Sequence, residues 1–230
     1  MPCPCLCQRE AMYFITFEGP EGSGKTTQLP ALAAWLREQG YDVFVTREPG
    51  GTPIGDQIRQ IIMGMENKAL VAEAEILLFS ASRAQLVREK IRPALEAGQL
   101  VLCDRYADST LAYQGYGHGL PLEPLRAITE FATGGLKPHL TLLLDLDPAV
   151  GLQRRQSAVA DGAEWNRLDD QALAFHRRAR AGYHALIAEE PERWRIVDAS
   201  QPPDAVQQAL RQQVSDFLQI DDRRPTTDDR

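Results

Sequence analysis

The sequence predicts an α/β fold in which helices cover both faces of a five-stranded parallel sheet. Five short apolar segments alternate with longer segments whose apolar residues recur at helical spacing, as in strand–helix–strand units. A glycine-rich loop joins the first strand to the first helix, and polar residues follow several other strands. The carboxyl ends of parallel strands meet at one edge of the sheet, so we expect the ligand site there.

The first half of the chain supplies three predicted strands, each short, apolar and rich in β-branched or aromatic residues. The first helix carries Leu29, Leu32 and Leu36 on one face and stops before Gly40, a residue that suits a helix end. The predicted strands are 12–17, 41–46 and 100–103, and the predicted helices are 27–39, 55–63, 69–90 and 93–98.

The second half of the chain continues this alternation. A helix begins at 109–115, and Gly115, Gly117 and Gly119 then predict a mobile loop in which His118 is solvated. Because no linker or internal repeat divides the chain, we predict one domain over residues 12–220. The remaining predicted strands are 140–144 and 194–197, and the remaining helices are 122–133, 149–156, 172–188 and 205–218.

Composition restricts the possible partners of the chain. The 230 residues include 25 basic and 32 acidic ones, a net charge of −7, and no basic block stands out. A nucleic-acid polymer or an anionic membrane is therefore not an expected partner. There is no apolar run long enough to span a bilayer and no signal-peptide pattern, so the expected location is the cytoplasm.

Both ends of the chain are predicted to be disordered, over residues 1–11 and 221–230. Cys3, Cys5 and Cys7 form a C-x-C-x-C cluster without a second ligand pair, so free thiols in a loose leader are favoured over a metal site. Met12 is the first residue of the first predicted strand, which suggests that translation begins there. An intact mass that includes residues 1–11 would refute this hypothesis.

The run Gly19-Pro-Glu-Gly-Ser-Gly-Lys-Thr26 fits the pattern G-x-x-x-x-G-K-[ST] between a predicted strand and a predicted helix. Glycines allow successive backbone N–H groups to point at one anion, and the helix start adds partial positive charge. Lys25 can reach the β- and γ-phosphates, and the Thr26 hydroxyl can bind Mg²⁺. The loop is therefore predicted to hold a nucleoside triphosphate.

Other polar residues fall at the same edge of the predicted sheet. Asp104 follows the strand at 100–103, where nucleoside triphosphatases place a carboxylate associated with Mg²⁺, although such an Asp can also cap the next element. Arg105 would then lie near phosphate. Arginines on both sides of the weak helical stretch 158–164 suggest a mobile flap, with a solvated helix face as the alternative.

Taken together and in order, the motifs resemble the thymidylate kinase family, the bacterial kind. The resemblance runs from about Tyr13 to Leu218, and it implies a P-loop three-layer sandwich with a lid at about 151–168. It also implies phosphorylation of dTMP to dTDP by ATP in dTTP biosynthesis, with Mg²⁺, and a homodimer formed through helices. The motifs are FEGPEGSGKTT at 17–27, TREPGGT at 46–52, LFSASR at 78–83, CDRYADS at 103–109, AYQG at 112–115 and ARAGY at 179–183.

The same resemblance implies a role for each matching residue. ATP would be bound by Gly19, Pro20, Glu21, Gly22, Ser23, Gly24, Lys25, Thr26 and Thr27. The residues implied for dTMP are Glu21, a cis Pro49, Arg59, Phe79, Arg83, Arg105, Thr110, Tyr113 and Gln114. Thr26 and Asp104 would hold the metal. The implied catalytic residues are Glu21, Lys25, Asp104, Arg105, Arg154 and Arg155.

Within the dTMP site the implied contacts are specific. Phe79 would stack on thymine, Arg83 would hydrogen-bond O4, and Gln114 would reach the N3 edge with Thr110 nearby. Tyr113 would crowd the 2′ position of the sugar and so favour deoxyribose. Arg59 and Arg105 would hold the acceptor phosphate, and Glu21 would face the sugar and phosphate contacts.

Because positions 20–23 lack Arg and Lys, the family pattern places the missing arginine in the lid. Arg154, Arg155 and Arg167 are the candidates, and we expect Arg154 or Arg155 to clamp the transferring phosphate. Some positions depart from the family pattern. Ser82 stands where Asp is common, His118 stands where Arg is common, and the lid has Asn-Arg-Leu-Asp at 166–169 where Asp-Arg-x-Glu is usual.

Two alternative functions remain possible from the sequence. A kinase for dUMP, UMP/CMP or a deoxynucleoside is one, since the single methyl group that separates dTMP from dUMP is worth only about 1–3 kcal/mol. A nucleotide-dependent switch is the other. A GTPase would show Asp-x-x-Gly after its third strand and an Asn-Lys-x-Asp motif, whereas this chain has Asp104-Arg-Tyr-Ala and no Asn-Lys-x-Asp. The apolar helix at 69–86 fits either a dimer contact or a core position.

Overall fold

A computed structural model describes residues 12–162 and 164–220 of the chain. The predicted leader with its three cysteines and the predicted tail at 221–230 lie outside the described residues. Among the described helices, none is both long and apolar enough to cross a membrane. The cytoplasmic location expected from the sequence stays a prediction.

The centre of the fold is a five-stranded sheet in which all neighbouring strands are parallel, as predicted. Its strand order is β2-β3-β1-β4-β5, so β1 lies between β3 and β4 and the strand order reverses there. The loop after β1 therefore opens at the position where such sheets bind ligands. The strands are β1 Phe14–Glu18, β2 Val43–Arg47, β3 Leu100–Asp104, β4 Leu140–Asp145 and β5 Trp194–Asp198.

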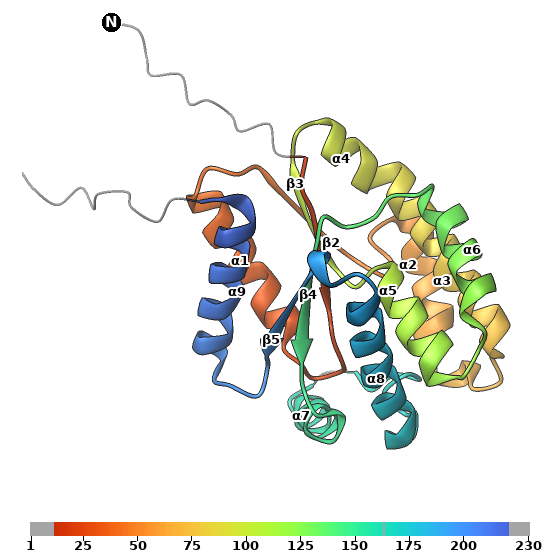
Figure 1. Cartoon of the computed structure of the whole chain (residues 1–230). Helices are drawn as coiled ribbons and strands as arrows, with labels where there is room; N and C mark the ends of the chain where they lie inside the picture. Colours follow the sequence, from red (N-terminus) through yellow and green to blue (C-terminus); the bar gives the residue numbers. More distant parts are fainter. Residues whose placement is uncertain (1–11, 163, 221–230) are drawn as a thin grey trace, which may run out of the picture.

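Helices cover both faces of the sheet because the strands are apolar on both (Figure 1). In β1, Ile15 and Phe17 pack in a core with α1 (Lys25–Glu38) and α9 (Pro203–Leu218), whereas Phe14 packs on the opposite face. The opposite face carries α2 Pro53–Met63, α3 Ala72–Leu86, α4 Arg92–Glu96, α5 Ala107–Thr110, α6 Leu122–Thr133 and α8 Leu173–Glu189, while α7 Pro148–Ala160 lies at the edge where the strands end.

Several short helical segments connect these elements. The predicted helix at 69–90 is α3 followed by a π-type segment, and the π-type segment leads directly into α4. α7 continues to Ala160, beyond the predicted end at 156, so the weak stretch is partly helical. The connecting segments are the 3₁₀ turns Met65–Asn67 and Pro191–Arg193 and the π-type segments Val87–Ile91 and Leu111–Gly117.

The mobile loop predicted around Gly115 and Gly117 is wrong, because both glycines lie in the π-type segment Leu111–Gly117. A Cβ on Gly115 would come within 2.4 Å of Leu122, and one on Gly117 within 2.7 Å of Phe175. The glycines therefore permit close packing against α6 and α8. His118 is not solvated as expected: its ring packs on that of Phe175 in a tilted arrangement, with ring centroids 4.7 Å apart.

Candidate functional site

One cavity of about 400 Å³ opens at the carboxyl edge of the sheet, and segments far apart in the sequence line it. Most of the residues predicted from the sequence meet there, but the lining does not include Gly19, Pro20, Ser23, Gly24, Thr27 or Arg154. Residues that sequence reasoning did not select also line it, among them Glu48 and Asp169. The predicted residues in the lining are Glu21, Gly22, Lys25, Thr26, Pro49, Arg59, Phe79, Arg83, Asp104, Arg105, Thr110, Tyr113, Gln114 and Arg155.

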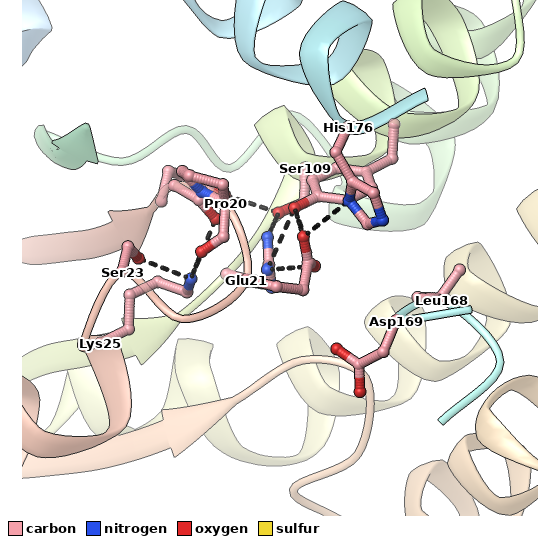
Figure 2. A network of polar contacts seen from close by, with 12 residues as sticks. Pro20, Glu21, Ser23, Lys25, Ser109, Leu168, Asp169 and His176 are labelled. Atoms are coloured by element: carbon pink, nitrogen blue, oxygen red, sulfur yellow. Dashed lines mark hydrogen bonds and ion pairs between the residues drawn. The ribbon is translucent and has the colours of Figure 1, made fainter. Parts of the chain in front are cut away.

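The glycine-rich loop curls around the side chain of Lys25 (Figure 2). Lys25 Nζ donates to the carbonyl oxygens of Gly19 and Pro20, both at 2.9 Å, and to Ser23 Oγ at 3.1 Å. Gly24 caps α1 with φ 93°, a conformation that favours glycine. Burial, followed by the nearby charge of Arg105, lowers the pKa of Lys25 to about 8. The loop thus presents a buried cation at the start of a helix.

The start of α7 packs tightly against this loop. A Cβ on Gly151 would lie 2.1 Å from the carbonyl oxygen of Glu21, and one on Gly22 would lie 2.1 Å from that of Gly151. This contact brings Arg154 beside the loop, where its Nη1 donates to the carbonyl oxygens of Ala199 at 3.0 Å and Gly22 at 3.5 Å. Arg154 therefore supports the loop's backbone from outside the cavity.

Glu21 joins the loop to Arg105 and to His176, and Figure 2 shows His176 beside its carboxylate. Its carboxylate accepts from Arg105 Nη2 at 2.9 Å and from the Tyr113 hydroxyl at 2.8 and 2.9 Å, and it lies 3.2 Å from His176 Nδ1. Burial raises the pKa of Glu21, but Arg105, His176 and Lys25 outweigh it and bring the pKa down to about 2. Glu21 thus stays ionised and holds Arg105. His176 on α8 was missed because nothing near it in the sequence marks it.

A second buried carboxylate, Glu18 at the end of β1, holds the turn that carries Arg105. Arg105 adopts φ 68°, a left-handed conformation unusual for a residue with a side chain. Glu18 accepts from Tyr106 N at 2.8 Å, Ser109 Oγ at 2.5 Å and the Tyr183 hydroxyl at 2.7 Å. Burial and the charge of Asp108 raise the pKa of Glu18 to about 7.

The opposite wall of the cavity carries the residues predicted for an aromatic base. The Glu48–Pro49 peptide bond is cis, as expected. Arg83 is 1% exposed, and it donates through Nε to Glu48 Oε2 at 2.8 Å and through Nη2 to the Tyr106 carbonyl at 3.1 Å. Its Nη1 is buried and has no hydrogen-bond partner among the residues that the structure describes. Phe79, one turn earlier on α3, lies in the same wall, so this wall offers an aromatic face and a free donor.

The two predicted lid arginines that remain behave differently from each other. Arg155 lines the cavity, where its Nε and Nη2 donate to Asp169 at 3.1 and 2.7 Å. Arg167 is 5% exposed and donates to the Ile62 carbonyl at 2.9 Å and to Glu75. Arg167 therefore does not reach the glycine-rich loop, because a buried carboxylate on α3 holds it elsewhere.

The departures from the family pattern have local partners. Asn166 Nδ2 donates to Asp169 Oδ2 at 2.6 Å, and its Oδ1 accepts from Leu168 N at 2.9 Å, which closes the turn at 166–169. Ser82 Oγ accepts from Gly50 N at 2.9 Å. His118 Nε2 lies 3.6 Å from Glu75 Oε1. Each residue that departs from the family pattern thus has a polar neighbour in this structure.

Asp104 and Thr26 fit the role of Mg²⁺ ligands. Asp104 Oδ1 is buried and finds no hydrogen-bond partner in the described part of the chain, and Thr26 is exposed to the cavity that both residues line. Within residues 12–162 and 164–220, no cluster of three or more His, Cys, Asp or Glu could hold a metal by itself. Mg²⁺ commonly takes only one or two protein groups and completes its shell with water and phosphate oxygens, which suits this arrangement.

Comparison with known proteins gives one consistent result. A family model described as thymidylate kinase matches residues 17–210. The thymidylate kinase of Thermomicrobium roseum is 55% identical over 213 residues, 93% of this chain and 99% of that protein. That of Deinococcus radiodurans is 55% identical over 205 residues, 88% and 96% of the two chains. A crystal structure of thymidylate kinase from Ehrlichia chaffeensis has a TM-score of 0.72 at 30% identity and covers 91% of this chain and 100% of that chain.

The contact between α7 and the glycine-rich loop predicts that Gly151→Ala weakens ATP binding. Overpacking of this kind costs about 1–3 kcal/mol, so we expect affinity to fall at least about fivefold even though alanine favours helices. Calorimetric titration with an ATP analogue measures the change. Gln156→Ala, at an exposed position of the same helix, is the control. Equal affinities for the two variants would contradict the prediction.

The raised pKa of Glu18 predicts a pH-dependent stability term. Between pH 4.5 and 7 the folded protein keeps a proton on Glu18 that the unfolded chain has released, so this term weakens stability as pH rises. Glu18→Gln removes the term, and its free energy of unfolding relative to wild type should rise across the same window. Urea titrations at several pH values measure it. Glu38→Gln, exposed on α1, should run parallel to wild type.

Proposed function

The chain belongs to the thymidylate kinase family, and we propose that it transfers the γ-phosphoryl group of ATP to dTMP and so forms dTDP for dTTP synthesis. The observation that carries this proposal is that one cavity joins a phosphate-binding loop to a wall suited to a pyrimidine. Lys25 marks the phosphate end, and Phe79 with Arg83 marks the base end. A donor and an acceptor nucleotide can therefore meet between them.

The acceptor would be read along one wall of the cavity. Phe79 stacks on thymine, the free Nη1 of Arg83 donates to O4, and Gln114 with nearby Thr110 faces the N3 edge. Tyr113 lies against Glu21 and Arg105, where its ring would crowd a 2′-hydroxyl and so favour deoxyribose. What supports this arrangement is that all of these side chains border the same space.

The phosphates would meet among cations. Arg59 and Arg105 hold the acceptor phosphate, and Lys25 holds the transferring group. Phosphoryl transfer needs positioning and charge neutralisation more than covalent chemistry from the protein. Thr26 and Asp104 would hold Mg²⁺, which when bound neutralises charge on the β- and γ-phosphates. Glu21 keeps Arg105 in place and remains charged itself.

The lid at 151–168 would supply the arginine that the loop lacks. Arg155 borders the cavity and is tied to Asp169, so it can exchange this carboxylate for a phosphate without a large movement. Arg154 is engaged with backbone carbonyls and Arg167 with Glu75. Of the candidates, Arg155 is therefore the one we assign to the transferring phosphate.

The experiment that tests the function is a coupled assay of dTDP formation from ATP, Mg²⁺ and dTMP. A panel of dUMP, UMP, CMP and thymidine at the same concentrations separates this proposal from related kinases. We expect dTMP to give the highest kcat/KM. A higher value for another acceptor, or no phosphorylation of any acceptor, would overturn the proposal.

Replacement of the lid arginines should separate their roles. An arginine on the transferring phosphate is worth about 10³–10⁵ in rate, so Arg155→Ala should lower kcat by that order with a small change in KM for dTMP. Arg154→Ala should mainly weaken ATP binding through the loop. Steady-state kinetics with both substrates varied measures this. An Arg155→Ala enzyme with wild-type kcat would refute the assignment.

We also propose that two copies of the chain pair through α3 and α6. These helices pack side by side, and they expose Leu77, Phe131 and the adjacent Val71 at 57%, 89% and 60%. Large apolar side chains exposed on two neighbouring helices favour burial against a partner. Sedimentation velocity should show a dimer for wild type and a monomer for Phe131→Asp. Ile196→Asp, at an exposed position on the edge strand β5, should leave the dimer intact.

A further inference from the structure

Glu75 on α3 is a buried carboxylate outside the lining of the cavity, and it contacts a residue that lies inside it. Only 1% of Glu75 is exposed. Its Oε1 accepts from Gln114 Nε2 at 2.7 Å, and its Oε2 accepts from Arg167. His118 Nε2 is 3.6 Å from Oε1. Glu75 therefore acts on a ligand only through Gln114.

Glu75 dictates which end of the Gln114 amide faces the cavity. An ionised carboxylate only accepts hydrogen bonds, so the NH₂ group of Gln114 must turn toward Glu75 and the Oε1 atom must turn away. Among the described residues, none donates a hydrogen bond to Gln114 Oε1, and Gln114 lines the cavity. Burial raises the pKa of Glu75, but His118, Arg167 and Gln114 outweigh it and hold the pKa below its usual value.

The neighbouring Arg83 presents the opposite property. Its guanidinium can only donate, Glu48 holds it in place, and its Nη1 has no partner within the described residues. The wall thus offers one donor and one acceptor. Thymine presents an acceptor at O4 and a donor at N3, which match them. Cytosine presents a donor at its 4-amino group and an acceptor at N3, so both contacts would be repulsive.

We propose that Glu75 is a positioning residue that locks the Gln114 amide and thereby selects 4-keto pyrimidines over 4-amino pyrimidines. This inference rests on the proposed function, because it takes Gln114 to face the base. If Glu75 did not lock it, the amide could rotate by half a turn and offer its NH₂ group to N3 of cytosine. Selectivity would then depend on Arg83 alone.

The test compares dTMP with 5-methyl-dCMP, which differs from it only at the N3 and C4 positions of the base. Glu75→Gln keeps the shape of the side chain but can donate as well as accept. We expect the ratio of kcat/KM for dTMP to that for 5-methyl-dCMP to fall about tenfold or more. Glu75→Asp shortens the side chain, but an aspartate can still only accept hydrogen bonds. Its ratio should therefore stay close to that of wild type, even if the rates with both substrates fall.

A purely structural role predicts the reverse order, with the Gln variant close to wild type and the Asp variant impaired in both substrates. An unchanged ratio in Glu75→Gln would overturn the inference. Glu73→Gln, exposed on the same helix, is the matched control and should leave both substrates unaffected. If the wild-type enzyme does not phosphorylate dTMP, the proposed function is wrong. If it does, but Glu75→Gln has the wild-type ratio of kcat/KM values, only this inference is wrong.

A measurement on the wild-type protein covers the case in which Glu75→Gln does not fold. The imino proton at N3 of ¹⁵N-labelled dTMP should be protected from solvent exchange in the complex, because the Gln114 oxygen accepts it. An N3 imino proton that exchanges as fast as in free dTMP would overturn the inference without any variant.

Discussion

The constraint on which the site depends is that several positive side chains must gather around one cavity in a protein of net charge −7. Lys25, Arg83, Arg105 and Arg155 border the same space. They would repel one another if they were unpaired, and burial adds a desolvation cost to each. Each arginine of this set is therefore held by a carboxylate of its own, so the cations are positioned before any phosphate arrives.

These carboxylates come from different parts of the fold. Glu21 in the glycine-rich loop holds Arg105, Glu48 in the loop after β2 holds Arg83, and Asp169 near the lid holds Arg155. Because parallel strands end at one edge, loops from distant segments reach the same cavity. The sheet thus brings these loops to one cavity, and the ion pairs orient each arginine within it.

The base end of the cavity follows the same principle with hydrogen bonds instead of charge. Considering the described residues alone, Glu48 leaves one donor of Arg83 unpaired, and Glu75 leaves one acceptor of Gln114 unpaired. Glu75 also holds Arg167 from the far side of the lid. One buried carboxylate therefore connects the segment that would cover ATP with Gln114, the residue that we propose reads the pyrimidine.

The sequence by itself determined the strand–helix order, the parallel sheet, the phosphate loop and most of the residues that line the cavity. These features depend on residues that are close together in the sequence. The phosphate loop uses consecutive backbone N–H groups, and each strand or helix shows its own period of apolar residues. Only the tertiary structure decided that Glu18, Glu75 and His176 hold the site, that Arg167 is turned away from the loop, and that Gly117 packs against α8. Such partners lie far apart in the sequence and meet only when the helices pack. No local sequence pattern therefore predicts these contacts.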